Sequence, residues 1–383
     1  MLFFRALAFL RQISVVYLQK LNLFNFKNIE EAQLEFRGKT VCLLGKNGSG
    51  KTSLLDAIYY LSFTKSAVNP SDTQNIRFGQ SQFIVKGIFE KESRAHELIC
   101  SFQNGQKKLI REDGQDCIKY SEHVGKYPVV LIAPQDIELI WDGSEMRRKF
   151  FDSLISQLDR AYLENLIVYV NCLKQRNSLL KIFSESGKTD FDLLASYDQR
   201  IIPAGNYIAA KRKQFTAEFL PFFKEHYRFL VEDSKEEVEI QYRSDLEKFS
   251  FADLLTKNLQ RDIVLQRTSS GIHRDDFNFL INGQELKRIG SQGQQKSFLI
   301  ALKLAEFQSI AEAKALKPIL LLDDIFDKLD DFRIHQLMRL VSQGMFGQIF
   351  ISDAREGRSS QLVKEAQVEA QFFTVENGTF TNG

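Results

Sequence analysis

The amino-acid sequence predicts an α/β protein with a mixed β-sheet and an inserted lobe of helices. Short apolar runs, which are typical of buried strands, lie near both ends of the chain, at residues 40–44 and 319–323. Between them, from about residue 147 to residue 230, apolar residues recur at helical spacing. The chain has 383 residues, which is enough for two domains. The expected division is a main domain of residues 16–145 and 235–383 and an inserted helical lobe of residues 146–234.

The first part of the chain shows the patterns of several strands and one helix. Residues 17–36 alternate between polar and apolar side chains like two strands, and the apolar segment 40–44 is bounded by Gly38 and Gly45. The other elements expected here are a helix over 51–61, antiparallel strands at 83–90, 97–103 and 107–112, and a buried strand at 128–133.

The second part of the chain is expected to be helical at first and then to return to strands. Helical spacing covers residues 147–180 and 197–230, and Pro203 and Pro221 are expected to start or kink the second stretch. The sustained heptads of a long coiled coil are missing. The elements expected after residue 235 are strands at 237–243, 276–281, 319–323 and, as the last, 348–352, with helices at 294–314 and 331–343.

The overall composition is ordinary for a globular protein, with 44% hydrophobic and 26% charged residues. The net charge is only +2, so any surface that binds nucleic acid must be a local basic patch. Four cysteines without a CxxC pair argue against zinc and thioredoxin-type sites and suit a reducing, cytoplasmic environment. No segment approaches the roughly 20 apolar residues that span a membrane.

One segment fits the pattern G-x-x-x-x-G-K-[ST], namely Gly45-Lys46-Asn47-Gly48-Ser49-Gly50-Lys51-Thr52. It lies between an expected strand and an expected helix, which is the setting of a phosphate-binding loop. The glycines allow successive backbone N–H groups to surround phosphate oxygens, and the helix dipole adds positive charge. Lys51 is expected to reach the β- and γ-phosphates of a nucleotide, and Thr52 is expected to ligate Mg²⁺.

A second segment is an apolar strand, residues 319–322, that ends in Asp323 and Asp324. Asp323 is the candidate for contact with Mg²⁺. Asp324 is the candidate for orienting and activating the attacking water, because phosphoryl transfer depends mostly on positioning and charge neutralisation. The alternative is an acidic strand end that caps the following turn.

A third segment, Ser291-Gln292-Gly293-Gln294-Gln295, opens the long helix expected over 294–314. A serine, a glycine and free N–H groups at a helix start favour an anion. Because the chain already has one phosphate loop, a second phosphate site suggests that a partner subunit completes the nucleotide site. The alternative is an ordinary helix N-cap.

The order of these three segments is that of ABC-type P-loop ATPase heads. Transporter subunits share this order but carry LSGGQ, whereas Gln292 replaces the first glycine of that motif here. From about residue 16 onward the chain resembles the RecF family of recombinational DNA repair ATPases. RecF proteins resemble SMC heads with a compact helical lobe in place of the coiled-coil arm. The matching segments are 17–21 with 26–28, 45–52, Gly271-Ile272-His273-Arg274-Asp275-Asp276, 291–296 and 322–330.

The resemblance implies an activity and a set of partners. RecF proteins bind ATP, dimerise around two nucleotides, bind DNA that is gapped, single-stranded or double-stranded, and hydrolyse ATP slowly. They act with RecO and RecR in loading recombinase at gaps. By motif position, Ser291 and Gly293, together with Gln294 as a nucleotide-binding residue, would face the γ-phosphate of the partner's ATP. The segment Asp327 to Asp330 would cross the dimer interface.

Three further residues are candidates for the nucleotide site by the same resemblance. Gln135 follows the strand at 128–133 and would sense Mg²⁺ or water, unless it is a plain loop residue. Lys27 and Asn28 would touch the nucleotide, unless they form a solvated turn.

The chain departs from the family pattern at two places. Members usually begin just before the Tyr17-Leu18 pair, so residues 1–15 look like a surplus extension, and translation is expected to start at Val16. The last expected strand ends in Ser352 and lacks the histidine that ABC transporters use near the γ-phosphate. His273 and His335 come too early for that role and are expected to be structural or surface residues.

Two compact basic clusters are candidates for DNA contact, Arg147-Arg148-Lys149 and Lys211-Arg212-Lys213. Each could bind phosphates without reading sequence. Each also lies on an expected helix, where a charged face is usually only solvated.

The sequence therefore predicts an ATP-dependent DNA clamp of repair, which ATP closes as a dimer and hydrolysis releases. An SMC-like structural ATPase would need long heptads, and a transporter subunit would need LSGGQ and a membrane partner. An antiphage ATPase of the same superfamily would need an effector domain, for which the segment after the final expected strand is short.

Overall fold

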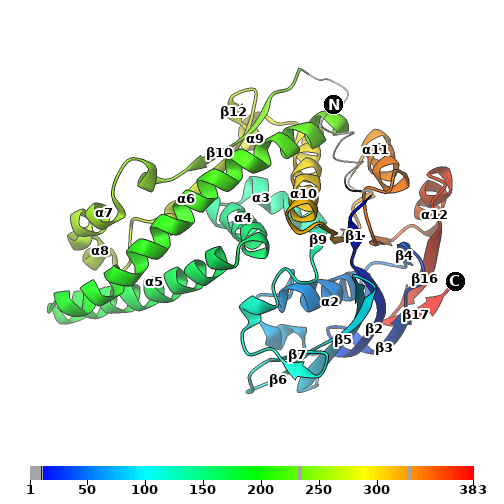
Figure 1. The fold of residues 1–383 in the computed structure, drawn as a ribbon, viewed down its shortest axis with the longest axis horizontal. Helices are drawn as coiled ribbons and strands as arrows, with labels where there is room; N and C mark the ends of the chain where they lie inside the picture. The colour runs from blue at the N-terminus through cyan, green and yellow to red at the C-terminus, as the bar shows by residue number, and fades with distance from the viewer. Residues whose placement is uncertain (1–9, 11, 232–234, 327–328) are drawn as a thin grey trace. The chain divides into compact units, whose positions relative to one another are not determined.

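The computed structural model describes residue 10 and residues 12–231, 235–326 and 329–383 (Figure 1). The chain forms two compact units. One consists of Met1–Asp136, Glu225–Ser234 and Lys296–Gly383, and the other of Ile137–Lys224 and Lys235–Gln295. Residues 235–295, which the sequence analysis placed in the main domain, thus belong to the unit that contains most of the helical lobe.

The first unit is built on two β-sheets, with helix α2 (Lys51–Phe63) packed against strands of both. One sheet has the order β17-β16-β4-β15-β14-β9 and is mixed, as predicted, because only β17 is antiparallel to its neighbour. Its central strands are fully buried, which explains their apolar runs. The strands are β4 (Thr40–Leu44), β9 (Val129–Ile132), β14 (Ile319–Asp323), β15 (Ile349–Asp353), β16 (Ala370–Glu376) and β17 (Thr379–Asn382).

The second sheet of this unit is antiparallel and has the order β3-β2-β5-β6-β7-β8. Alternate residues of β5, such as Phe83 and Val85, are buried in one core with Leu54 and Ile58 of α2. The strands are β2 (Tyr17–Phe26), β3 (Ile29–Glu35), β5 (Gln82–Lys91), β6 (Arg94–Gln103), β7 (Leu109–Glu112) and β8 (Gln115–Asp116).

The prediction that the chain has its last strand at 348–352 is wrong, because β16 and β17 follow it. They form a hairpin around Asn377 and Gly378, both with positive φ. Asn-Gly between two alternating segments is a strong hairpin signal. The hairpin adds β16 to the free side of β4 and so completes the sheet.

The start of the described chain packs within the first unit. Strand β1 (Ser14–Val15) pairs in parallel with β13 (Leu316–Lys317), and Leu10 is fully buried. The translation start at Val16 stays a prediction, and these contacts give Leu10, Ser14 and Val15 a packing role when they are present. The unit also contains α10 (Gln292–Lys314) from Lys296 onward, α11 (Asp331–Ser342) and α12 (Glu356–Glu365).

The second unit combines helices with a three-stranded sheet of order β10-β11-β12. Helix α6 (Phe191–Leu230) belongs to this unit as far as Lys224 and keeps both Pro203 and Pro221 inside it, so the predicted start near residue 197 is wrong. Its residues Ile201 and Ile208 are fully buried in the core of this unit, and that packing offsets the cost of the prolines. The helices here include α3 (Glu138–Trp141), α4 (Ser144–Leu158), α5 (Arg160–Ser186), α7 (Phe251–Lys257), α8 (Leu259–Leu265) and α9 (Leu286–Ile289), and the strands are β10 (Val238–Arg243), β11 (Asp276–Ile281) and β12 (Gln284–Glu285).

Across the described segments, every helix is too short or too polar to pass through a bilayer.

The two basic clusters proposed for DNA contact lie in the second unit, and their arginines are used inside it. Arg212 is 1% exposed and donates to both oxygens of Asp152 and to Oδ2 of Asp275. Arg147 donates to both oxygens of Asp276, and Arg148 donates to the backbone carbonyl of Asp275. The interpretation of Arg212 as a phosphate contact is therefore wrong, because its side chain is buried and fully paired. For Arg147 and Arg148, which are half-buried and already paired within their unit, that interpretation stays a prediction.

The Gly271-to-Asp276 segment, which carries part of the family resemblance, is a structural junction. Burial raises the pKa of the Asp275 carboxyl, an effect that Arg212 and Tyr242 oppose. Burial also lowers the pKa of His273 to about 4, so its neutral ring accepts from the Tyr169 hydroxyl and donates to a backbone carbonyl. A Cβ at Gly271, where φ is +125°, would lie 2.5 Å from the Tyr169 oxygen. His273 thus has the structural role that the sequence analysis expected.

We expect Arg212→Met to lower the unfolding free energy of this unit by about 3–5 kcal/mol, because it leaves the buried Asp275 and the half-buried Asp152 without their cation. Lys213→Ala is the matched control, since Lys213 is exposed and its ion pair with Glu247 is at the surface. Denaturant unfolding followed by the fluorescence of Trp141, the one tryptophan of the chain, measures both variants. Equal stability of the two variants would contradict the structural role of Arg212.

Candidate nucleotide-binding site

The predicted phosphate-binding loop connects β4 to α2 in the first unit. Gly48 and Gly50 have φ values of 79° and 122°, which other residues rarely adopt. These two glycines let the chain turn tightly enough for the first amides of α2 to point into the loop. The loop therefore has the local form that the sequence predicts, an anion-binding concavity at a helix N-terminus.

Lys51 is 3% exposed and its ammonium lies inside this loop. Nζ donates to the carbonyl oxygens of Gly45 at 2.8 Å and Lys46 at 3.2 Å, and it lies 3.9 Å from Oδ2 of Asp324. The lysine is thus held between the loop backbone and the acidic end of β14. A cation in this position neutralises charge on a bound phosphate.

Thr52 and Asp323 meet directly, although 271 residues separate them. The Thr52 hydroxyl lies 3.0 and 2.9 Å from the two oxygens of Asp323. Burial raises the pKa of Asp323, and hydrogen bonds from Ser352 and Thr52 oppose that rise. A buried carboxylate beside a hydroxyl is a set of oxygen ligands that fits Mg²⁺.

Asp324 follows in the left-handed region, at φ 45°. Its backbone N–H donates to the hydroxyl oxygen of Ser352 at 2.9 Å, and that hydroxyl in turn donates to Oδ1 of Asp323 at 2.7 Å. Ser352 therefore fixes both acidic residues through one oxygen. The sequence analysis noted only that this strand lacks a histidine. A polar residue at the end of an otherwise apolar strand was the signal that could have identified it.

Lys27 and Asn28 lie in the turn between β2 and β3, beside the loop. Lys27 forms an ion pair of 2.6 Å with Asp56, which is nearly fully buried. The Asn28 amide donates to the carbonyl of Gly48, and its oxygen accepts from the Ser53 hydroxyl. The interpretation of these residues as a merely solvated turn does not fit these contacts, since Asn28 bridges the middle of the loop and the first turn of α2.

The β16–β17 hairpin also supports the loop, and the sequence analysis did not foresee this. The Gly378 N–H donates to the Ser49 carbonyl at 2.7 Å. A Cβ at Gly45 would lie 2.2 Å from the carbonyl oxygen of Val375, so only glycine fits there. The last strands of the chain therefore set the path of the loop near its start.

These residues enclose a pocket of about 560 Å³, all within the first unit. Its lining includes Lys27, Asn28, Pro134, Asp324 and residues of the segment 47–53. Gln135 lies next to Pro134 in the short turn after β9 but is not among the lining residues. Its assignment as a sensing residue stays a prediction.

Ser291 lies in the other unit, where it caps α10. Its hydroxyl accepts from the Gln294 N–H at 3.2 Å, and the Gln294 side-chain oxygen accepts from the Ser291 N–H at 2.8 Å. This reciprocal pair is a capping box. Ser291 and Gln292 are nevertheless exposed, and Gly293, which follows them, has no side chain, so this helix start stays open to solvent.

The segment expected to cross a dimer interface is only partly described, because residues 327 and 328 lie outside the described chain. Asp330 caps α11 by accepting from the Arg333 N–H at 2.9 Å. Arg333 also donates to the Ser297 hydroxyl of α10. The interface role of this segment stays a prediction.

A family model described as RecF/RecN/SMC N terminal domain matches residues 17–381. A curated relative, the DNA replication and repair protein RecF of Flavobacterium johnsoniae, is 45% identical over 360 residues, covering 94% of this chain and 100% of the relative. The chain belongs to the RecF family.

Solved structures agree with this RecF assignment. The recombination mediator protein RecF-ATP in the RecFOR pathway matches with a TM-score of 0.84 and 29% identity, over 96% of this chain and 99% of that chain. The Smc head domain of Pyrococcus furiosus, bound to the C-terminal domain of ScpA, matches with a TM-score of 0.55 and 15% identity, over 96% of both chains. The second match shows fold alone. The fold is the ABC-type ATPase head of RecF, as predicted. The two alternatives, a transporter subunit and an SMC-like structural ATPase, fit these matches less well.

We expect Ser352→Ala to reduce the rate of ATP hydrolysis by this RecF chain about tenfold, because a buried hydrogen bond that positions Asp324 contributes about 1–1.5 kcal/mol. The dissociation constant for ATP should stay the same, since the loop amides and Lys51 are untouched. Steady-state kinetics and fluorescent-nucleotide binding separate the two quantities. Ser352→Thr, which keeps the hydroxyl, should retain activity, and equal losses in both variants would contradict a positioning role.

Proposed function

We propose that this chain is an ATP-dependent DNA-binding protein of recombinational repair and replication, which closes as a homodimer on ATP and opens after slow hydrolysis. Its site of action is the cytoplasm. The observation that carries the proposal is the contact of Thr52 with Asp323 beside Lys51 and Asp324, in a chain of the RecF family. A phosphate loop and an acidic strand end assembled in this way suit phosphoryl transfer to water.

Each residue of the pocket has a separate task in this mechanism. The backbone amides after Gly45 and the Lys51 ammonium bind and neutralise the phosphates. Thr52 and Asp323 are the residues that would hold Mg²⁺, which supplies charge neutralisation on the phosphate oxygens when bound. Asp324 orients the attacking water and accepts its proton, with its backbone fixed by Ser352.

The second half of the nucleotide site comes from another copy of the chain. Ser291 is exposed at an open helix start, and Gly293 and Gln294 lie in the same first turn. The hydroxyl and the free N–H groups of this turn suit the γ-phosphate of ATP bound to the partner. Nucleotide binding then couples directly to dimer closure, because the phosphate is shared by two chains.

DNA is the substrate on which the dimer closes, and double-stranded, single-stranded or gapped forms fall within this proposal. The relative of known structure is described as a recombination mediator of the RecFOR pathway, and on that basis RecO and RecR are the partners we propose. Arg212 is buried and is excluded as a phosphate contact, and the half-buried Arg147 and Arg148 are already paired within their own unit. Exposed lysines such as Lys149 and Lys213 remain the basic positions of the two clusters that face solvent.

We expect Lys51→Ala to abolish ATP binding and with it ATP-dependent dimerisation, because the phosphates lose their buried cation. Asp324→Asn should instead bind ATP normally, remain dimeric and lose hydrolysis by about a hundredfold or more, since a general base is worth 10²–10⁴. Nucleotide binding, sedimentation and phosphate release, with and without gapped DNA, measure these properties. Normal turnover in the Asp324→Asn variant would remove Asp324 from its assigned role.

A mixing experiment tests whether Ser291 acts on the partner's nucleotide. Lys51→Ala and Ser291→Arg should each be inactive alone. An equal mixture should recover about a quarter of the wild-type rate, because half of the dimers are mixed and each has one intact site. A chain that carries both substitutions, mixed with inactive Lys51→Ala, is the control and should recover nothing. An inactive mixture of the two single variants would show that Ser291 serves only its own chain.

A further inference from the structure

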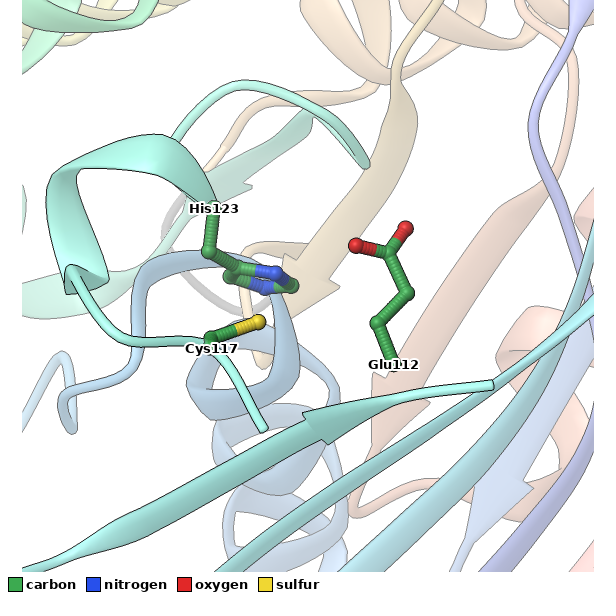
Figure 2. Close-up of side chains that lie close together, drawn as sticks. All are labelled: Glu112, Cys117 and His123. Carbon is green, nitrogen blue, oxygen red and sulfur yellow. The ribbon is translucent and has the colours of Figure 1, made fainter. Parts of the chain in front are cut away.

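A second group of reactive side chains lies away from the nucleotide pocket, beside the edge of the antiparallel sheet. Glu112 ends β7, Cys117 directly follows β8, and His123 follows the short turn Tyr120–Glu122. One ligand atom from each of these three residues lies within 4.8 Å of the other two. Figure 2 shows the His123 ring beside the Cys117 sulfur, with the Glu112 carboxylate facing them.

His123 is held in the neutral tautomer whose Nδ1 can bind a metal ion. It is fully buried, and its Nε2 lies 2.6 Å from the carbonyl oxygen of Leu61. A carbonyl only accepts, so Nε2 carries the proton and Nδ1 keeps a free lone pair. Burial lowers the pKa of His123, which keeps the ring neutral. Nδ1 has no hydrogen-bond partner in the described chain, an expensive condition for a buried nitrogen.

The other two residues supply a thiol and a carboxylate. Cys117 is a free, half-buried cysteine. Glu112 accepts from the Tyr127 hydroxyl at 2.8 Å and from the Lys126 ammonium at 2.5 Å. The Lys126 side chain is 43% exposed, so it can turn to solvent and free one carboxylate oxygen. Tyr127 would continue to orient the other oxygen.

We propose that Cys117 Sγ, His123 Nδ1 and a Glu112 carboxylate oxygen bind a thiophilic divalent cation, with Zn²⁺ as the best fit and water as the fourth ligand. Sulfur and imidazole ligands select Zn²⁺ over Mg²⁺ and Ca²⁺, which prefer oxygen. Bond lengths of about 2.0–2.3 Å place zinc ligands roughly 3.3–3.7 Å apart, so each pair of ligand atoms closes by at most about 1.5 Å on binding.

The contacts around the three ligands are those that zinc sites use. A backbone carbonyl fixes the histidine through its other nitrogen, and a tyrosine hydroxyl fixes the carboxylate. On binding, the Cys117 thiol gives its proton to solvent and the thiolate bonds to the metal, so affinity rises with pH. The cation would tie the β7–β8 hairpin and the turn before Tyr127 to Leu61 in α2, the helix that starts at Lys51.

Zinc binding by the full-length chain tests the proposal without reference to ATP hydrolysis. Chelator-treated protein, in millimolar Mg²⁺ to fill oxygen sites, is titrated with Zn²⁺ against a chromophoric chelator. We expect one Zn²⁺ per chain, and an affinity at least tenfold weaker in Cys117→Ser and in Glu112→Gln. Co²⁺ in place of Zn²⁺ should give a near-ultraviolet thiolate-to-metal band that Cys117→Ser removes.

His96→Asn is the matched control. His96 lies on the neighbouring strand β6 and pairs with Asp113, so it tests for adventitious binding by a surface histidine. It should bind Zn²⁺ like the wild type. Unchanged affinity in Cys117→Ser, or a Co²⁺ complex without the thiolate band, would overturn the proposal. Because Cys117 is only half-buried, its serine variant should fold, and circular dichroism checks this.

Discussion

The parallel pairing of β4, β15 and β14 is the constraint on which the nucleotide site depends. In this register Asp323 lies opposite Ser352, and Asp353 lies opposite Leu44, the last residue before the loop. The carboxyl ends of all three strands therefore meet at one edge of the sheet, and ligands bind at that edge in open α/β sheets. Ser352 links the two acidic residues there, and Thr52 reaches them from the first turn of α2.

Helix α2 connects this edge with the proposed zinc site. Its first residue, Lys51, lies among the phosphate-binding amides, and the carbonyl of Leu61, near its other end, holds His123. The helix is buried along most of its length, so both ends are fixed by packing as well as by these contacts. The sequence analysis argued against zinc because it searched for CxxC pairs. Ligands drawn from a hairpin and a turn leave no such spacing.

The arginines of the two basic clusters stabilise the fold of the second unit. Arg212, Arg147 and Arg148 bind the two aspartates that end the segment 271–276, and this joins the helices to the three-stranded sheet. Buried charges of this kind need complete partners, because an unpaired charge away from water is costly. In a chain of net charge +2, a run of basic residues therefore does not predict DNA binding until the acidic residues that pair with it are known.

The sequence by itself determined the features whose signals are local. The glycines of the loop, the apolar strand that ends in Asp323 and Asp324, and the capped start of α10 are each specified by neighbouring residues. Helical and strand periods also placed most elements within a few residues. The chain order of the three motifs indicated an ABC-type ATPase head, and the matching segments, including 271–276 and 291–296, indicated the RecF family.

Tertiary structure decided the rest, because those features need partners that are distant in the chain. Ser352 acquires its role only through pairing with β14, and Gly378 reaches Ser49 only because β16 pairs with β4. Arg212 becomes buried only when Asp152 and Asp275 converge on it. A sequence records residue types and spacing along the chain, whereas charge neutralisation and strand register depend on distances in space.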